Sequence, residues 1–351
     1  MTFKRLLKIA SLITLATIIF FASAIFAQEP HTIVFYNVEN FFDTIDSPDT
    51  DDAEFTPKGK NKWTVSKYSK KLSNIEQVLS DISEKNGGYP TLIGLAEIEV
   101  RSVLEDIVAT SKLKGANYKI AHFDSPDARG VDVALLYRPD RFKIEGSKAI
   151  SAVVPGEPNF RSRDILSVWG TIEKEEFFVM VAHWSSRGGG QAKTESRRMA
   201  TAAQMRTIVD SVRMIRPDTK FVLMGDFNDD PNDKSVVESL GAKLSTDGLS
   251  EGDLYTPFYI LMMAGYGTLA YGGEWNLFDN IVVSENLVNP RAGKLKLQES
   301  IYNPKYNGNI FRPSYLFQQS GKYKGYPFRS FSGGEFIEGY SDHLPVFINI
   351  D

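Results

Sequence analysis

Apolar, β-branched runs in this chain repeatedly meet short polar clusters at their ends, and this pattern constrains the fold more than any other feature. Four runs end at Asn37, at Glu97, at His183 and at Gly225-Asp226-Phe227-Asn228, and Ser341-Asp342-His343 directly precedes a fifth. Short apolar runs bounded by turn residues are typical of buried strands. Because a carboxylate, an amide or an imidazole recurs at one strand end after another, we expect one polar pocket at the edge of a sheet.

Predicted strands and helices alternate irregularly along the chain. The apolar runs predict strands at residues 32–38, 91–97, 118–123, 131–137, 165–171, 177–183, 220–224, 278–283 and 344–348. Apolar residues at three- and four-residue steps predict helices at residues 65–82, 103–108 and 191–215. No repeat and no Pro/Ser-rich linker divides the chain. We therefore expect one α/β domain, with a mixed sheet system covered by helices.

The first 27 residues have the features of a secretory signal. Basic residues Lys4, Arg5 and Lys8 precede an uncharged, largely apolar stretch at residues 9–27. This predicts an exported protein, periplasmic or extracellular, whose mature domain is residues 28–351. The alternative is an uncleaved membrane anchor, because about 18 apolar residues can just span a bilayer. The chain has no cysteine, which excludes disulfides, thiolate metal sites and a lipoprotein anchor.

The charge balance excludes a protein that coats nucleic acid with a uniformly basic surface. The formal net charge of the 351 residues is −4. Without the three basic residues of the predicted signal, 37 basic and 44 acidic residues remain, a net charge near −7. A local basic groove is compatible with this balance. The hydrophobic fraction of 42% is ample for a sizeable core.

Glu97 and Asn37 carry oxygen atoms at the ends of two predicted strands. Glu97 follows the apolar residues 92–96, and a carboxylate there either caps the strand in solvent or binds a ligand. Hard divalent cations such as Mg²⁺ prefer oxygen ligands and keep several waters, so one or two carboxylates suffice to hold them. The amide oxygen of Asn37 can complete such a set, and a turn-forming asparagine is the alternative.

His183 follows the apolar residues 178–182, and Arg187 and three glycines come shortly after it. A flexible glycine run beside an arginine and a histidine suits close approach to a phosphate. We therefore expect His183 and Arg187 to contact a phosphate. The alternative is a structural histidine that precedes a solvent-exposed loop.

Asp226 and Asn228 form the pair for which a purely structural explanation is weakest. They alternate in an extended segment, so both side chains leave the same face of the strand. One can hold a nucleophilic water while the other donates a hydrogen bond to a phosphoryl oxygen. A plain turn would explain the following Asp229-Asp230-Pro231 but not this pair.

Ser341-Asp342-His343 places a carboxylate beside an imidazole at the entry to the last predicted strand. Histidine titrates near neutral pH and suits general-base catalysis, and Asp342 can act as a metal ligand or as an orienting carboxylate. Asp279, in the predicted strand 278–283, is a second candidate to hold and polarise the imidazole. A strand-end pocket of this composition is how metal-assisted phosphoester hydrolysis is usually assembled.

Together and in this order, the motifs resemble the endonuclease/exonuclease/phosphatase superfamily, the metal-dependent relatives of DNase I. The matching residues are Asn37, Glu97, His183, Asp226-Phe227-Asn228, Asp279 and Ser341-Asp342-His343, which span the mature chain. The resemblance implies a four-layer α/β sandwich, in which two mixed sheets pack face to face with helices on both outer faces. It also implies a bound Mg²⁺ or Mn²⁺.

The resemblance further implies a role for each matching residue. Asn37, Glu97 and Asp342 correspond to metal ligands, Asp226 to the residue that orients or activates water, Asn228 to a phosphate contact, and His343 to a catalytic imidazole oriented by Asp279. His183 matches the histidine of the DNase I-like, sphingomyelinase-like and inositol-phosphatase-like branches. Abasic-site repair enzymes generally carry tyrosine there. The cation and His183 would neutralise developing charge on the phosphoryl oxygens while water attacks in line.

Residues 300–334 bear on the choice of substrate, because they hold basic and aromatic residues and no acidic ones. The five basic residues are Lys305, Arg312, Lys322, Lys324 and Arg329, and the nine aromatic residues are Tyr302, Tyr306, Phe311, Tyr315, Phe317, Tyr323, Tyr326, Phe328 and Phe331. Aromatic faces stack on bases and cations follow the backbone, which predicts contact with DNA or RNA. The alternatives are a surface loop folded on its own aromatic residues and insertion into a membrane surface to reach a lipid phosphodiester.

The sequence therefore predicts an exported, nuclease-like phosphodiester hydrolase that depends on Mg²⁺ or Mn²⁺. A phosphatase or a sphingomyelinase-like lipid phosphodiesterase is the alternative, and a catalytically inactive binding module is a second one. We expect a monomer without an obligate protein partner.

Overall fold

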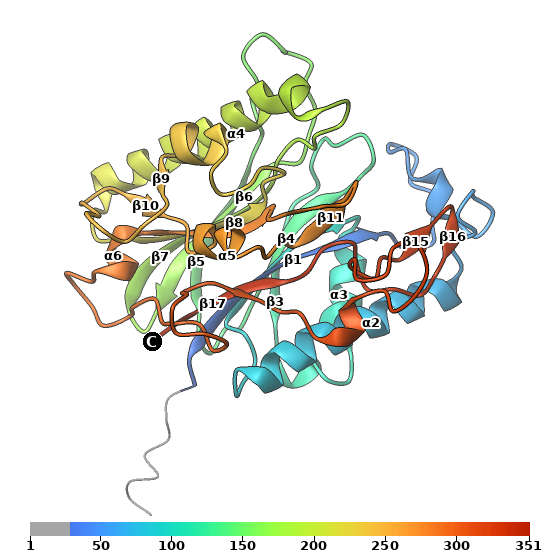
Figure 1. The fold of residues 1–351 in the computed structure, drawn as a ribbon, viewed down its shortest axis with the longest axis horizontal. Helices are drawn as coiled ribbons and strands as arrows, with labels where there is room; N and C mark the ends of the chain where they lie inside the picture. The colour runs from blue at the N-terminus through green and yellow to red at the C-terminus, as the bar shows by residue number, and fades with distance from the viewer. Residues whose placement is uncertain (1–28) are drawn as a thin grey trace, which may run out of the picture. The chain divides into compact units, whose positions relative to one another are not determined.

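Two mixed β-sheets, stacked face to face, form the centre of the protein (Figure 1). The computed structural model describes residues 29–351, so the predicted signal at residues 1–27 lies outside the described part of the chain. Residues His31–Asp351 form one compact unit. None of the helices in the described residues is long and apolar enough to cross a membrane.

The first sheet has six strands, and its neighbours in space are far apart in sequence. Their order across the sheet is β14 (Asn309–Ile310), β17 (Val346–Ile350), β1 (His31–Phe41), β2 (Leu92–Ile98), β4 (Asp132–Tyr137) and β3 (Lys119–His122). Strands β1 and β2 pair in parallel, whereas β1 and β17 pair antiparallel. The carboxyl ends of β1 and β2 therefore lie at the same edge of the sheet, beside the N-terminal end of β17.

The second sheet has seven strands and a parallel pair of its own. Their order is β5 (Lys143–Ile150), β6 (Ile165–Ile172), β7 (Glu175–His183), β8 (Lys220–Asp226), β13 (Asp279–Ser284), β10 (Leu254–Tyr255) and β9 (Ala242–Lys243). Strands β7 and β8 are parallel, and β13 runs antiparallel to β8. Two small hairpins lie outside both sheets, namely β11 (Leu269–Tyr271) with β12 (Glu274–Asn276), and β15 (Phe331–Ser332) with β16 (Glu335–Phe336).

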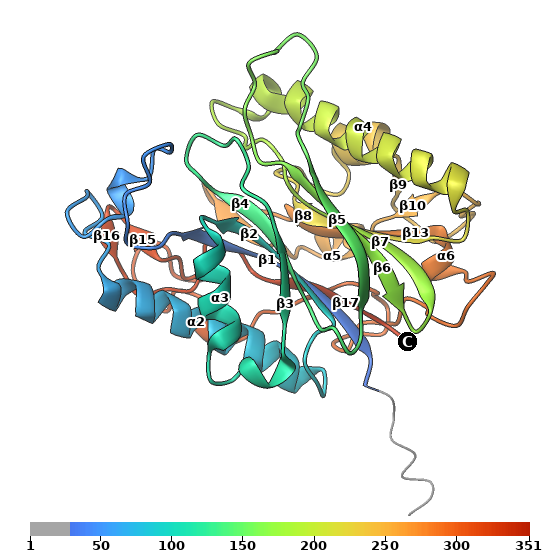
Figure 2. The same ribbon diagram turned by 180° about the vertical axis from the view of Figure 1, so that it is seen from behind.

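Helices cover both outer faces of the sheet pair, as Figure 1 and the reverse view in Figure 2 show. Helices α2 (Val65–Lys85) and α3 (Arg101–Ala109) pack on the first sheet, and α4 (Gln191–Ile215) packs on the second. Shorter helices are α5 (Tyr259–Met263), α6 (Glu285–Val288), the 3₁₀ turns η1 (Ala53–Phe55), η2 (Lys114–Ala116) and η4 (Ser314–Leu316), and the π-helical turn η3 (Ser235–Ser239). The predicted four-layer α/β sandwich is confirmed.

Packing between the sheets explains why their strands read as unbroken apolar runs. Strand β1 is buried along ten of its eleven residues, because the second sheet covers one face and helices cover the other. The two sheets approach closely at Gly94 in β2, where an added Cβ would overlap the sulfur of Met224 in β8. The absence of a side chain at Gly94 makes room for Met224 between the layers.

The predicted elements agree well with the structure, and one large strand was missed. The predicted helix at residues 191–215 has the bounds of α4. Strand β5 escaped prediction because it is an edge strand without a fully buried residue, so charged residues replace an apolar pattern. Charged side chains on an exposed edge also discourage pairing with other chains.

Candidate active site

Strand register brings the predicted site residues to one edge of the sandwich. Asn37 in β1 pairs with Ala96 in β2, one residue before Glu97. In the second sheet, Asp226 in β8 lies between His183 in β7 and Asp279 in β13. Parallel strands end at the same edge of a sheet, so these polar side chains converge there, as predicted from the sequence.

Hydrogen bonds between the two sheets close the site. His343 Nδ1, at the entry to β17, lies 2.7 Å from Asp279 Oδ2, and Asn37 Nδ2 donates to Asp226 Oδ2 at 3.0 Å. The same oxygen of Asp226 lies 3.4 Å from His183 Nε2 and 3.7 Å from His343 Nε2. All five residues are at most 7% exposed. Asp226 Oδ2 is thus the atom on which side chains from both sheets converge.

Ser341 fixes the segment that carries His343. Its hydroxyl donates to the carbonyl oxygen of Asn37 at 2.7 Å and accepts the backbone N–H of His343 at 3.0 Å. The backbone N–H of Leu344 donates to Thr268 O at 2.9 Å. The serine of the Ser-Asp-His motif therefore has a positioning role, because its hydroxyl is used in holding the backbone.

Four non-glycine residues around the site adopt left-handed backbone angles. Glu39, Asn40, Glu97 and Asn228 have φ values of 55°, 47°, 63° and 50°. The register of β2 with its neighbours shifts on either side of Glu97, as in a β-bulge, and Glu97 Oε2 accepts the Asn40 N–H at 2.8 Å. Backbone angles of this kind cost free energy and cluster at functional sites, where they aim side chains.

The two histidines at the site have opposite electrostatic environments. Burial lowers the pKa of His183 well below its ordinary value, and the charges of Arg163 and Arg129 lower it further. Burial also acts to lower the pKa of His343, but the carboxylates of Asp279 and Asp226 outweigh burial and raise it well above 6.5. The two environments therefore favour the neutral imidazole at His183 and the protonated imidazole at His343.

Asp226 is perturbed as well, and in the direction that suits proton transfer. Burial raises its pKa to about 6, and the charge of Asp279 adds to this rise. The charge of His343 and the backbone N–H of Asn228, which donates to Oδ1 at 2.9 Å, act in the opposite direction. A carboxylate that titrates near neutral pH can accept a proton efficiently from a water molecule.

Arg163 is a buried cation at the site that is absent from the predicted site residues. Its guanidinium donates to the carbonyl oxygen of Trp184 at 2.6 Å and to Asp127 Oδ2 at 3.2 Å. Asn228 Nδ2 donates to the same carbonyl oxygen at 3.1 Å, so Arg163 supports the turn that holds Asn228. The signal available in the sequence is that Arg163 directly precedes an apolar predicted strand. Arginine is rarely fully buried, so this position alone did not indicate a buried cation.

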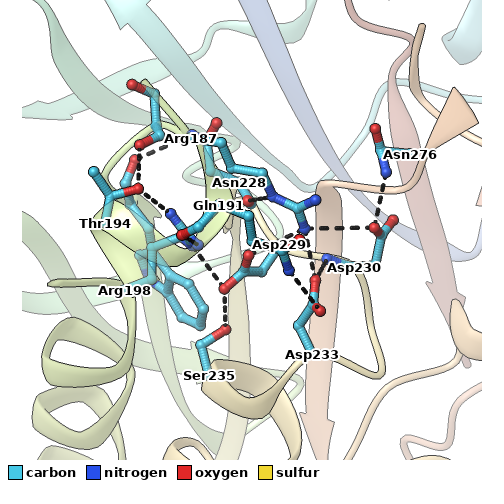
Figure 3. A network of polar contacts seen from close by, with 12 residues as sticks. Arg187, Gln191, Thr194, Arg198, Asn228, Asp229, Asp230, Asp233, Ser235 and Asn276 are labelled. Atoms are coloured by element: carbon cyan, nitrogen blue, oxygen red, sulfur yellow. Dashed lines mark hydrogen bonds and ion pairs between the residues drawn. The ribbon is translucent and has the colours of Figure 1, made fainter. Parts of the chain in front are cut away.

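Arg187 has contacts that argue against the predicted role in phosphate binding. Its guanidinium donates to Asp233 at 2.6 Å, to Asp229 at 3.1 Å and to the carbonyl oxygen of Asn228 at 2.8 Å (Figure 3). It also lies over the ring of Phe278. Several carboxylates neutralise this guanidinium, so it ties the loop after β8 in place and offers little free charge to a phosphate.

Oxygen-rich groups at the site fit a hard divalent cation. Ligand atoms of Asp226, Asp279 and His343 lie within 4.8 Å of one another, and Asp279 Oδ1 is buried without a hydrogen-bond partner among the described residues. Of the predicted ligands, Asn37 lies beside Asp226, and Asp342 Oδ1 is 3.9 Å from His343 Nε2. The ligand roles of Asn37, Glu97 and Asp342 stay predictions, and their oxygen chemistry suits Mg²⁺ or Mn²⁺.

A buried ion pair fastens helix α2 to the segment that leads into the site. Lys71 Nζ in α2, which is 0% exposed, donates to Ser330 Oγ and to the carbonyl oxygen of Tyr340. It lies 4.0 Å from Glu39 Oε2, which accepts the Ser330 N–H at 2.6 Å. Burial lowers the pKa of Lys71 to about 8, and burial together with the charge of Asp342 raises the pKa of Glu39 to about 7.

Residues 300–334 are divided between packing and exposure. All five basic side chains are exposed. Phe311 is buried, Phe331 packs against Trp63, and Tyr315 donates to Asp81 at 2.6 Å. Tyr302 and Tyr323 remain exposed. The segment therefore folds partly on its own aromatic residues and still presents cations and some rings to solvent.

Comparisons with known proteins agree with this architecture. Among solved structures, D. rerio TDP2 complexed with single-strand DNA product is 14% identical with a TM-score of 0.53, covering 92% of this chain and 100% of that one. The human nocturnin catalytic domain is 13% identical with a TM-score of 0.52 (92% and 95% covered), and a Bacteroides thetaiotaomicron mannosyl-6-phosphatase is 16% identical with a TM-score of 0.51 (91% and 99% covered). At these identities, the likeness shows the fold alone.

Curated protein sequences give no match to this chain. A family model described as Endonuclease/Exonuclease/phosphatase family matches residues 32–351, which is nearly all of the described chain. The chain therefore belongs to the endonuclease/exonuclease/phosphatase family of metal-dependent phosphoester hydrolases.

Proposed function

We propose that the protein is a Mg²⁺-dependent phosphodiesterase that cleaves nucleic acid by in-line attack of water, with Mn²⁺ as the alternative cation. The observation that carries this proposal is the buried His343–Asp279 pair, which meets Asp226 and Asn37 at the edge shared by both sheets. An imidazolium and an amide can stabilise charge at a phosphoryl centre, and a carboxylate near its titration point can accept a proton there.

The protonation state of each residue determines its role in the proposed reaction. Asp279 holds the imidazole of His343 through Nδ1, so that Nε2, which lies 3.7 Å from Asp226, points into the site. As a cation, His343 stabilises negative charge that develops on the phosphoryl oxygens. Asp226, whose pKa is raised to about 6, orients the attacking water and accepts its proton. His183, held neutral, donates a hydrogen bond to a phosphoryl oxygen.

A divalent cation would be held by Asn37, Glu97 and Asp342, and when bound it supplies Lewis-acid stabilisation of a phosphoryl oxygen. Each of these side chains has one oxygen engaged in the protein. Asn37 Oδ1 accepts the Glu39 N–H at 3.0 Å, and Asp342 Oδ2 accepts from Arg329 at 2.6 Å. Such contacts fix the orientation of ligand oxygens before an ion arrives.

Nucleic acid is the favoured substrate because cations and aromatic faces are exposed in residues 300–334. The structure of D. rerio TDP2 with a single-strand DNA product gives one related fold that holds DNA. A phosphatase is the second candidate, because a fold of the same kind belongs to a mannosyl-6-phosphatase. A lipid phosphodiesterase and an inactive binding module are the remaining alternatives, and the assembled polar site argues against inactivity.

The test compares substrate classes with and without metal. Plasmid DNA, single-stranded DNA, a chromogenic phosphodiester and a chromogenic phosphomonoester are incubated with Mg²⁺, with Mn²⁺ and with EDTA. We expect metal-dependent cleavage of DNA and of the phosphodiester, and a loss of roughly 10²–10³ in kcat on His343→Ala. Hydrolysis of the monoester alone would establish the phosphatase, and the absence of all turnover would support the binding module.

Export through residues 1–27 and a monomeric state also belong to this proposal. N-terminal sequencing of the protein recovered from the periplasm or medium should find residues 1–27 removed. Recovery of the full-length chain with membranes would support the anchor instead. Light scattering of the purified protein should give the mass of one mature chain.

A further inference from the structure

A cavity of about 360 Å³ opens beside the catalytic edge, between two segments that lie outside the main sheets. Residues 270–273 of the β11–β12 hairpin form one wall, and side chains of loop 318–329 form the other. Asp342, from the Ser-Asp-His motif, completes the lining. Apart from Arg329, which orients Asp342, the walls contribute no residue to the proposed chemistry.

The cavity is directly connected to the catalytic centre. Leu269, at the start of the hairpin, forms an antiparallel bridge with His343. Asp342 Oδ1 lies 3.9 Å from His343 Nε2, and Asp342 Oδ2 accepts a hydrogen bond from Arg329, which also lines the cavity. A group seated in the cavity is therefore adjacent to a phosphate held at His343.

The walls combine aromatic faces with positive charge. Tyr271 is 81% exposed and Tyr323 is 39% exposed, so neither ring is used in the core. Tyr323 lies 5.9 Å from Tyr326, ring centre to ring centre, and Tyr326 in turn packs near Trp275 at 6.4 Å. Lys322 Nζ lies 5.3 Å above the ring of Tyr323. The cavity therefore offers aromatic surfaces for stacking and the ammonium group of Lys322, which forms no ion pair with a carboxylate among the described residues.

We propose that this cavity is a subsite for a nucleobase next to the scissile phosphate, with Lys322 placed for a neighbouring phosphate. The proposal rests on the nuclease function proposed above and extends it to named specificity residues. A volume of 360 Å³ lies at the small end of ligand pockets, which suits one base better than a lipid chain. A sugar would need several acceptors for its hydroxyls, whereas Gln318 and Asp342 are the main acceptor side chains in the lining.

The experiment compares two substrates that differ in the base. One is a short single-stranded oligothymidylate, and the other is methyl p-nitrophenyl phosphate, a phosphodiester without a base. Stacking on an aromatic side chain contributes about 5- to 150-fold per base. We expect Tyr271→Ala and Tyr323→Ala to lower kcat/KM for the oligonucleotide more than for the small diester by this factor, mainly through KM. Tyr271→Phe, which keeps the ring, should retain the parent ratio.

Phe123→Ala is the matched control, because Phe123 is an aromatic residue of 40% exposure that does not line the cavity. It should leave the ratio of the two substrates unchanged. Equal losses on both substrates, or no loss in either tyrosine variant, would overturn the subsite while leaving the nuclease function intact. Cleavage of the small diester without cleavage of DNA would overturn the proposed nuclease function, and the nucleobase subsite with it.

Absence of turnover on every substrate would instead count against the proposed function. The subsite is then tested separately, by fluorescence anisotropy of labelled oligothymidylate in EDTA. Weaker binding by Tyr271→Ala and parent-like binding by Tyr271→Phe would support the subsite without any catalysis. Equal binding by all three proteins, or tighter binding of mannose 6-phosphate that depends on Tyr271, would refute it.

Discussion

Replacement of Lys71 by methionine should destabilise the protein strongly, although Lys71 touches no substrate. The side chain is fully buried and serves as a charged donor to Ser330 and Tyr340, with Glu39 at 4.0 Å. Methionine keeps most of the apolar stem but leaves the buried carboxylate of Glu39 with Arg329, at 3.8 Å, as its remaining cationic neighbour. Removing one partner of a buried pair costs about 3–5 kcal/mol, and we expect a loss in this range at pH 7.

The assay is urea unfolding followed by tryptophan fluorescence, to which the buried Trp63 near Phe331 contributes. The matched variants are Glu39→Gln and the double variant with Lys71→Met. Because glutamine can still accept the Ser330 N–H, the double variant should be more stable than the two single losses added together, by about 0.5–3 kcal/mol. A Lys71→Met loss below about 1 kcal/mol, or strictly additive losses, would refute the account of this pair.

Three further predictions concern the site, the pH dependence and the sheet interface. Asp279→Asn should lower kcat by roughly 10- to 150-fold without a large change in urea midpoint, because it removes a charge-assisted hydrogen bond to His343 of about 1.5–3 kcal/mol; an unchanged kcat would contradict the orienting role. Burial and the charge of Arg141 lower the pKa of His31, so its contribution to stability is present above pH 6.5 and is lost as pH falls through the folded-state pKa; His31→Gln should flatten this part of the curve of unfolding free energy against pH, and a parallel curve would be inconsistent with it. Gly94→Ala should cost about 1–3 kcal/mol in chemical denaturation through overlap with the sulfur of Met224, and a neutral effect would show that the Met224 side chain can shift to make room.

The strand-end residues could be predicted because their positions follow from periodicity alone. Apolar runs ended at Asn37, His183 and Asp226, and parallel pairing in each sheet then brings such ends to one edge. Helix α4 was predicted with its bounds, since its apolar residues recur over 25 residues. Both inferences depend on contacts that are local in sequence or are imposed by sheet geometry.

Other parts of the site depend on contacts that sequence periodicity does not encode. Arg187 was expected at a phosphate, but its partners Asp229 and Asp233 follow it by 42 and 46 residues, and only the fold brings them together. The left-handed backbone at Glu97 arises from a register shift between strands, which no residue type at that position signals. The buried position of Arg163 likewise depends on Asp127 and on the backbone carbonyl of Trp184, directly after β7.

Because hydrogen bonds of the active site connect the two sheets, catalytic activity depends on how the sheets pack against each other. Asn37 and His343 belong to one layer, and their partners Asp226 and Asp279 belong to the other. A loosened state that keeps its secondary structure but lets the layers slide would separate each donor from its acceptor. Under gradual denaturation, hydrolysis should therefore be lost while the far-ultraviolet circular dichroism is still native-like. Enzyme activity would then report on the packing of the two layers more sensitively than secondary structure does.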